Sequence, residues 1–198
     1  MELSAENIGR FFPYYLTEER KKGLLEALRD VPSRRYYATI SDPEPLQGDG
    51  WRGLQVLRFN DGARDRIKGI VLTNSCDLAG DNTRLMPAQL NFAPLIVLDR
   101  YLDILRANGV AERRVDQHAR DVRAQTVSDL FYLPADTNIG PEHIALLHDI
   151  HTIPMPVFDD DANRARVFSL SDVGFYLFVF KLSVHFCRLH ENIDRSAG

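Results

Sequence analysis

The stretch Lys68-Gly-Ile-Val-Leu-Thr-Asn-Ser-Cys-Asp77 decides the expected fold, because a short apolar run rich in β-branched residues ends abruptly in polar residues. Such a run is typical of a buried strand, and a strand that ends at the surface supports its last side chains rigidly. The stretch therefore predicts a strand followed by a candidate site that holds a thiol and a carboxylate.

The residues around this stretch alternate between strand-like runs and turn signals. Strands are predicted over residues 35–40, 51–59, 68–73 and 92–98, with a turn at Asn60-Asp61-Gly62 between the second and third. Closely spaced strands of this kind predict a small SH3-like β-barrel or a strongly bent antiparallel sheet.

Apolar residues at helical spacing flank the strands on both sides. Helices are expected within residues 1–34, from Asp99 as the cap to Gly109, over 112–125, from Pro141 to about His151, and from Ser171 onward. The last of these has the longest amphipathic pattern in the chain, so we expect it to pack across the sheet.

The expected fold is therefore α+β, with N-terminal and C-terminal helices packed on the sheet in a single domain over 1–198. Residues 1–34 would form the N-terminal helices and 35–98 the barrel-like core. Residues 99–198 would form a helical extension, which includes a hairpin whose strands begin at Pro156 and Arg166.

Composition limits the classes of function. The chain has 24 basic and 28 acidic side chains and a net charge of -4, so nucleic-acid binding would need a local basic patch. The two cysteines lie far apart and the N-terminus does not resemble a signal peptide, which favours a cytoplasmic location. The apolar run Val173–Phe180 is too short to cross a membrane.

Several motifs have a simple structural interpretation. Gly48-Asp-Gly-Trp-Arg-Gly53 matches the dinucleotide-binding pattern but precedes a predicted strand rather than a helix, so a turn is favoured. The Asp159, Asp161 and Asn163 series lacks the glycine of a calcium loop and is interpreted as a solvated hairpin tip. We expect neither a cofactor nor a metal.

Histidines in the helix predicted from Pro141 to about His151 are a weaker metal candidate. His148 and His151 are three residues apart and would share one side of a helix, which suits a metal. However, they also extend an apolar stripe and have no evident third ligand. Partly buried, hydrogen-bonded histidines are therefore favoured over a zinc pair.

Cys76 is the candidate nucleophile. A thiolate needs exposure and nearby positive charge, which Lys68, Arg66 or a histidine could supply, but the adjacent Asp77 carboxylate opposes ionisation of the thiol. The favoured alternative is a structural cysteine, with Ser75 and Asp77 capping the turn that follows the strand. Thiol chemistry at Cys76 remains open as a further hypothesis.

Residues 68–75, followed about twenty residues later by Phe92-Ala-Pro-Leu-Ile-Val-Leu98, resemble the strand pair of PemK/MazF-like proteins, which are SH3-like barrels of toxin-antitoxin systems. The match covers roughly 48–98. The longer pattern, with Phe131-Tyr-Leu-Pro134 and the segment 185–191, resembles a group of uncharacterised bacterial proteins that combine such a core with a helical C-terminus.

This resemblance implies an RNA-cleaving site, but this chain differs from the family at three of its positions. The family's catalytic arginine corresponds to Lys68, its following proline to Gly69, and its catalytic hydroxyl to Ile96. Lysine can neutralise a phosphate, but it lacks the planar guanidinium with which arginine makes two parallel hydrogen bonds to one phosphate. Isoleucine cannot transfer a proton.

Two functions follow as hypotheses. The first is a non-catalytic PemK/MazF-like barrel that binds a protein or nucleic-acid partner in a toxin-antitoxin or defence module, and that could form a homodimer. The second is an endoribonuclease whose active site uses residues of the predicted strand at 68–73 and of the turn after it, with Arg64 or Arg66 binding the phosphate. The residues proposed for that active site, which we call the rebuilt site, are Lys68, Ser75, Cys76 and Asp77.

Overall fold

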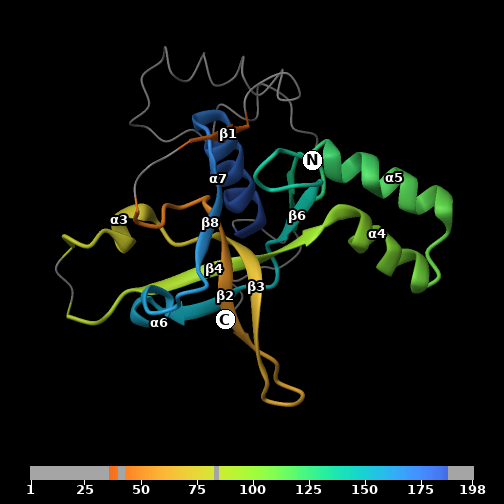
Figure 1. Ribbon diagram of the computed structural model, residues 1–198. Coiled ribbons are helices and arrows are strands. Elements are labelled where there is room, and N and C mark those ends of the chain that lie inside the picture. The colour runs from red at the N-terminus through yellow and green to blue at the C-terminus, as the bar shows by residue number, and fades with distance from the viewer. Residues whose placement is uncertain (1–35, 40–42, 83–84, 187–198) are drawn as a thin grey trace, which may run out of the picture.

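The computed structural model describes residues 36–39, 43–82 and 85–186 (Figure 1). The helices expected within residues 1–34 lie outside these ranges, as do Arg35, Ile40 and Cys187. The described residues contain eight strands and five helices.

The strands form one sheet in which every pairing is antiparallel. Its order is β1-β8-β2-β3-β4-β6-β5, with β7 also paired to β4. The strands are β1 (Tyr37–Ala38), β2 (Gly50–Leu57), β3 (Arg64–Val71), β4 (Gln89–Val97), β5 (Leu130–Leu133), β6 (His143–Leu146), β7 (His151–Pro154) and β8 (Ala165–Leu170).

The helices differ in how they meet the sheet. Helices α4 (Leu98–Ala107) and α5 (Glu112–Arg123) form a hairpin that projects from one end of β4 (Figure 1). Helix α7 (Asp172–Phe186) packs on the sheet beside β8. The short helices α3 (Ser75–Leu78) and α6 (Met155–Asp159) follow β3 and β7 directly.

The sheet curls into a half-barrel, which confirms the expected α+β class with a strongly bent antiparallel sheet. Register shifts in β2 mark where the sheet bends, and Gly53 lies at one of them with φ of +86°. A Cβ atom at Gly53 would lie 2.9 Å from the Cα of Arg164, so both the backbone conformation and the close approach require glycine.

Side chains join the two ends of the curled sheet. The hydroxyl of Tyr36 donates to the carbonyl oxygen of Tyr132 in β5 at 3.0 Å, and the hydroxyl of Tyr37 in β1 donates to that of Pro134 at 2.7 Å. β1 and β5 are the terminal strands of the order given above. The half-barrel is therefore closed by side-chain hydrogen bonds and not by a strand pair.

The inner side of the curl holds the largest apolar cluster, and α7 covers it. Phe178 of α7 packs on Phe131 of β5 with ring centroids 5.0 Å apart, and both side chains are fully buried. Burial stabilises the fold by roughly 2–3 kcal/mol for each such side chain. A second cluster lies around Trp51 and Phe158, and a third joins α4 and α5 to β5 and β6.

The prediction of a helix from Pro141 to His151 is wrong. Those residues form β6, a turn and the start of β7, and both strands pair along one edge of β4. The residues of β6 pack on both faces of the sheet, so they form a continuous apolar run whose sequence does not distinguish a strand from a buried helix.

The prediction of a hairpin is wrong for its first strand and right for its second. The segment at Arg166 is a strand as expected, but Pro156 lies in the first turn of α6. Two helix predictions are close: α4 begins at Leu98, with Asp99 in its first turn, and α5 ends two residues before Gln125. The strands β5 to β8 lie beyond Leu98, so the sheet extends past the expected core of residues 35–98.

Within the described ranges, no helix is long and apolar enough to span a membrane.

Candidate functional site

Basic side chains line one face of β3. Arg64, Arg66 and Lys68 alternate along the strand, and alternate residues of a strand point to the same side. Lys68 lies directly opposite Arg52 of β2 in the strand register, and all four side chains are exposed. We call Arg52, Arg64, Arg66 and Lys68 the basic face.

The charge of this region opposes that of the whole chain. Residues 50–71 carry five basic and two acidic side chains, a net charge of +3, whereas the chain has a net charge of -4. Like charges directly opposite each other, as in the Arg52 and Lys68 pair, destabilise a sheet. The fold therefore tolerates an unfavourable concentration of positive charge at this place.

Only one member of the basic face has a carboxylate partner among the described residues. The Nε of Arg66 donates to Oδ2 of Asp161 at 2.8 Å, and the side chain of Asp161 is 2% exposed. The side chains of Arg52, Arg64 and Lys68 form no hydrogen bond or ion pair with the described part of the chain. These three cations are therefore available to an anionic ligand.

The interpretation of residues 159–163 as a solvated hairpin tip is wrong. Asp161 accepts hydrogen bonds from Arg66, from the Nε2 of Gln55 at 3.1 Å and from the backbone N–H of Asn163 at 2.8 Å. The bond from Arg66, followed by those from Asn163 and Gln55, holds the pKa of the Asp161 carboxyl well below its usual range. This carboxylate anchors the base of the β2–β3 hairpin.

His143 lies at the inner end of the basic face. Its side chain is buried and its Nδ1 lies 2.7 Å from the carbonyl oxygen of Pro141. Burial lowers the pKa of His143, the Pro141 carbonyl opposes that shift, and the positive charge of Lys68 adds to it. His143 is therefore a buried, structural histidine whose charged form is disfavoured by burial and by the positive charge of Lys68.

The Ser75-Cys76-Asp77 segment forms α3, a single helical turn after β3. The Oδ1 of Asn74 accepts from the backbone N–H of Cys76 at 2.9 Å, so Asn74 is the capping residue and not Ser75 or Asp77. The hydroxyl oxygen of Ser75 accepts from the backbone N–H of Gln47 at 2.9 Å. Cys76 is exposed and free.

Asp77 borders an open depression of about 520 Å³ in which Cys76 and Lys68 take no part. Thr73 and the exposed side chains of Leu85 and Met86 also border it. Because the strand rises by about 3.3 Å per residue, Lys68 lies roughly 10 Å from the end of β3 at Val71, and α3 lies beyond that point. The structure thus separates Lys68 from Ser75, Cys76 and Asp77.

The histidines of the metal hypothesis lie on a turn and on a strand. Nδ1 of His148 lies 3.4 Å from Oδ2 of Asp129, and Nε2 of His151 lies 3.2 Å from Oδ1 of Asp149. The ring of His151 also stacks on Phe92 at 5.6 Å. Over the described ranges, no cluster of three or more ligating side chains could hold a metal ion.

Sequence reasoning missed two buried polar networks. In the first, the carboxylate of Asp49 lies 3.0 Å from the Nε of Arg166, whose guanidinium lies 5.1 Å from the ring centroid of Trp51. Burial raises the pKa of Asp49, while the Leu46 N–H, Ser169 and Arg166 lower it. The Gly48-Asp49-Gly50 sequence predicted only a turn, because Arg166 is remote in sequence.

The second network surrounds Gln125, which has φ of +59°. Its side-chain Nε2 donates to the carbonyl oxygen of Tyr132 at 2.8 Å and its Oε1 accepts from the Tyr132 N–H at 3.1 Å. The Nε2 also donates to the hydroxyl of Tyr36 at 3.1 Å, and the ammonium of Lys181 donates to the Gln125 carbonyl oxygen. Tyr36, Gln125, Tyr132 and Lys181 are thus joined in one hydrogen-bond network.

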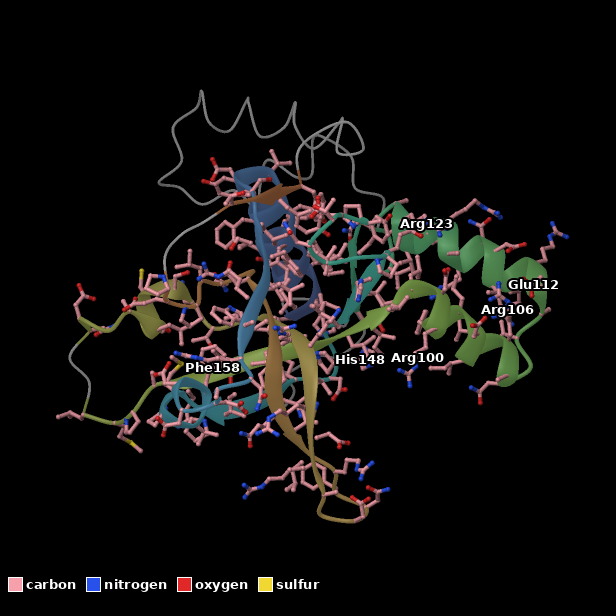
Figure 2. The ribbon with its side chains drawn as sticks, in the orientation of Figure 1. Arg100, Arg106, Glu112, Arg123, His148 and Phe158 are labelled. Atoms are coloured by element: carbon pink, nitrogen blue, oxygen red, sulfur yellow. The ribbon has the colours of Figure 1, made fainter. Side chains whose placement is uncertain are left out.

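Ion pairs elsewhere stabilise the helical hairpin. Figure 2 shows Arg106 and Glu112 together at the free end of α4 and α5, where Nη2 and Oε1 lie 3.0 Å apart. Arg123 of α5 donates from Nε and Nη2 to the two oxygens of Glu142 at 2.9 and 2.6 Å. These arginines have carboxylate partners, in contrast to Arg52, Arg64 and Lys68.

Comparison with protein-family models and with curated proteins finds no match for this chain. The PemK/MazF-like resemblance therefore remains a prediction from the residues themselves.

Proposed function

We propose that this chain is a non-catalytic binding module whose partner is a nucleic acid, held through the basic face. The observation that carries the proposal is the alignment of Arg64, Arg66 and Lys68 on one side of β3, with Arg52 opposite. Phosphate backbones are recognised mainly by such positive charge. The toxin-antitoxin or defence setting implied by the PemK/MazF-like resemblance belongs to the same proposal.

The arrangement of the candidate catalytic residues supports binding over cleavage. A general acid or base must reach the reacting group together with the residue that stabilises the developing charge. Here Lys68 lies roughly 10 Å or more along the strand from α3, and the Ser75 oxygen accepts a backbone hydrogen bond. The rebuilt endoribonuclease keeps one supporting observation, which is the position of Asp77 beside an open depression.

The test is fluorescence anisotropy with the full chain and labelled single-stranded and duplex oligonucleotides at low salt. The double variant Arg64→Gln/Lys68→Gln is expected to bind about tenfold more weakly, because two charge-assisted contacts to phosphate are lost. Arg113→Gln/Arg114→Gln is the matched control, since both arginines are exposed on α5 and the charge change is the same.

Two results would contradict this proposal. Equal binding by the wild-type chain and the Arg64→Gln/Lys68→Gln variant would place the contact surface elsewhere. Cleavage of the RNA during the assay would favour the endoribonuclease instead, and a loss of that cleavage in Lys68→Ala and Asp77→Ala would assign it to the rebuilt site.

A further inference from the structure

The outer part of the β2–β3 hairpin stands apart from the rest of the sheet. β8 pairs with β2 only through Gly50–Arg52, and β4 pairs with β3 only through Gly69–Val71. Among the residues that the structure describes, 54–57 and 64–67 therefore pair only with each other. Figure 1 shows this two-stranded arm projecting away from the helices and the remaining strands.

The base of the arm is supported on both of its sides: apolar residues pack on the side opposite the basic face, and Asp161 contacts the side of the basic face itself. Leu54 is fully buried, and Ile67 and Val56 pack in the same cluster as Trp51 and Phe158. Asp161 holds Arg66 and Gln55 from the neighbouring loop. The arm is therefore anchored at its base and projects freely only toward its tip.

The tip itself is well ordered by local hydrogen bonds. The N–H of Arg58 donates to the carbonyl oxygen of Ala63 at 2.9 Å, and the N–H of Gly62 donates to that of Arg58 at 2.8 Å. Asp61 accepts from the Ala63 N–H at 3.0 Å and pairs with the Arg58 guanidinium at 3.0 Å. Gly62, with φ of +69°, allows the chain to reverse.

This ordered tip presents an aromatic ring to solvent. Phe59 is 94% exposed, and Leu57, two residues earlier, is 49% exposed. Arg64 of the basic face lies opposite Leu57 in the strand register, so positive charge and apolar surface are adjacent. A single exposed phenylalanine is common, but Phe59 lies at the end of a hairpin whose strands carry the basic face, so an aromatic ring and basic side chains, the two features that bind single-stranded nucleic acids, occur on one hairpin.

We infer that Phe59 is a stacking residue, which packs its ring on the face of an exposed nucleobase while the basic face holds the adjoining phosphates. This inference rests on the proposed function and adds to it a contact with bases. Every nucleobase offers an aromatic face, so such a contact tolerates any sequence. The ordered turn limits the entropy lost when the ring is fixed against its ligand.

The test separates base contacts from phosphate contacts by using two labelled strands of equal length, one natural and one abasic. Phe59→Ala is expected to weaken binding to the natural strand by about 5- to 100-fold and to leave binding to the abasic strand unchanged. Ile104→Ala is the matched control, because Ile104 is an exposed apolar residue on α4 and lies outside both the arm and the depression beside Asp77. Since Phe59 is exposed, its replacement should leave the circular dichroism spectrum unchanged.

A second variant keeps the ring and adds a signal. Phe59→Trp is expected to bind the natural strand as tightly as the wild-type chain does and to show quenched indole fluorescence on binding. The native Trp51 is 6% exposed and contributes a constant background. A duplex of the same sequence then identifies the source of the base: an effect of Phe59→Ala on the single strand alone indicates an unpaired base, and an effect on both indicates a base displaced from the duplex.

The inference and the proposed function fail differently. If Phe59→Ala binds both strands as the wild-type chain does, while Arg64→Gln/Lys68→Gln binds both more weakly, stacking is overturned and phosphate binding stands. An equal loss on the natural and abasic strands also overturns stacking. If the wild-type chain binds no strand at low salt, the proposed function fails, and the stacking inference fails with it.

Discussion

At the scale of the residue, Lys181 places an ammonium group inside the core. Its side chain is 3% exposed and donates to the backbone carbonyl of Gln125, whose side chain in turn pairs with Tyr132. Burial lowers the pKa of Lys181 to about 8, and the negative charge of Asp129 limits that shift. The folded chain therefore releases this proton more readily than the unfolded chain does.

This difference predicts a dependence of stability on pH. Between about pH 8 and the ordinary lysine pKa near 10.4, the unfolded state binds more protons, so the free energy of unfolding should rise with pH. The expected rise from pH 8 to 9.5 is roughly 1–2 kcal/mol, measured by urea unfolding. Above that range the raised pKa of Tyr36 acts in the opposite direction.

Lys181→Met is the control for this prediction, because methionine keeps an unbranched apolar chain without a titrating group. The variant should show little change in the free energy of unfolding from pH 8 to 9.5. The same rise in the variant as in the wild-type chain would assign the pH dependence to other groups.

Sequence analysis singled out Arg64, Arg66 and Lys68 as candidate residues but did not predict their common face. The strand was predicted to begin at Lys68, whereas β3 begins at Arg64, so the alternation of the three side chains along one strand appears only in the structure. The partner of Arg66 could not be predicted, because Asp161 is 95 residues away and its own segment looks like an exposed acidic loop. Sequence analysis also placed Lys68 and Cys76 in one candidate site. The extended strand and the turn that follows it separate the two residues in space, and this distance is not evident from their closeness in the sequence.

At the scale of the element, Gln125 takes the place of a missing neighbour strand. Tyr132 lies in β5, which pairs with β6 on one edge and ends the sheet on the other. The Gln125 amide makes with the N–H and C=O of Tyr132 the hydrogen bonds that a paired strand would make. An unpaired edge of this kind would otherwise be open to pairing with another chain.

Replacing Gln125 by glycine should expose this edge. Glycine adopts the φ of +59° without strain, so the loss reflects the removal of the buried Gln125 side chain with its hydrogen bonds, together with the greater freedom of glycine in the unfolded chain. We expect the free energy of unfolding to fall by about 2–4 kcal/mol, together with faster hydrogen exchange at the Tyr132 amide.

The exchange rates of β3 amides provide the internal reference for this variant. Unchanged protection at Tyr132 in Gln125→Gly would contradict the assignment of the amide as a substitute for a strand.

Elements also differ in how far sequence predicts them. The strands β2, β3 and β4 follow from alternating or β-branched runs with a turn between them, and α7 follows from its opening Ser171-Asp172 and its apolar residues. In contrast, β6 could not be separated from a helix, because its residues are buried on both sides by strands and helices remote in sequence.

At the scale of the whole molecule, the half-barrel turns one continuous sheet into two surfaces of different chemistry. Its inner side holds the apolar cluster covered by α7, and β3 continues from that cluster, through Ile70, to the exposed basic face. The β2–β3 hairpin thus presents the exposed basic face in a chain whose net charge is -4. This local concentration of positive charge supports the proposed binding of a nucleic acid, and sequence composition alone does not reveal it.

The salt dependence of nucleic-acid binding tests this claim most directly. If three to four cations of the basic face contact phosphates, the logarithm of the binding constant should fall with the logarithm of salt concentration with a slope of about −2 to −3 for a single strand. In Arg64→Gln/Lys68→Gln the slope should become shallower by about 1.5, while Arg113→Gln/Arg114→Gln should keep the wild-type slope. A slope near zero for the wild-type chain, or the same slope in all three proteins, would contradict the account.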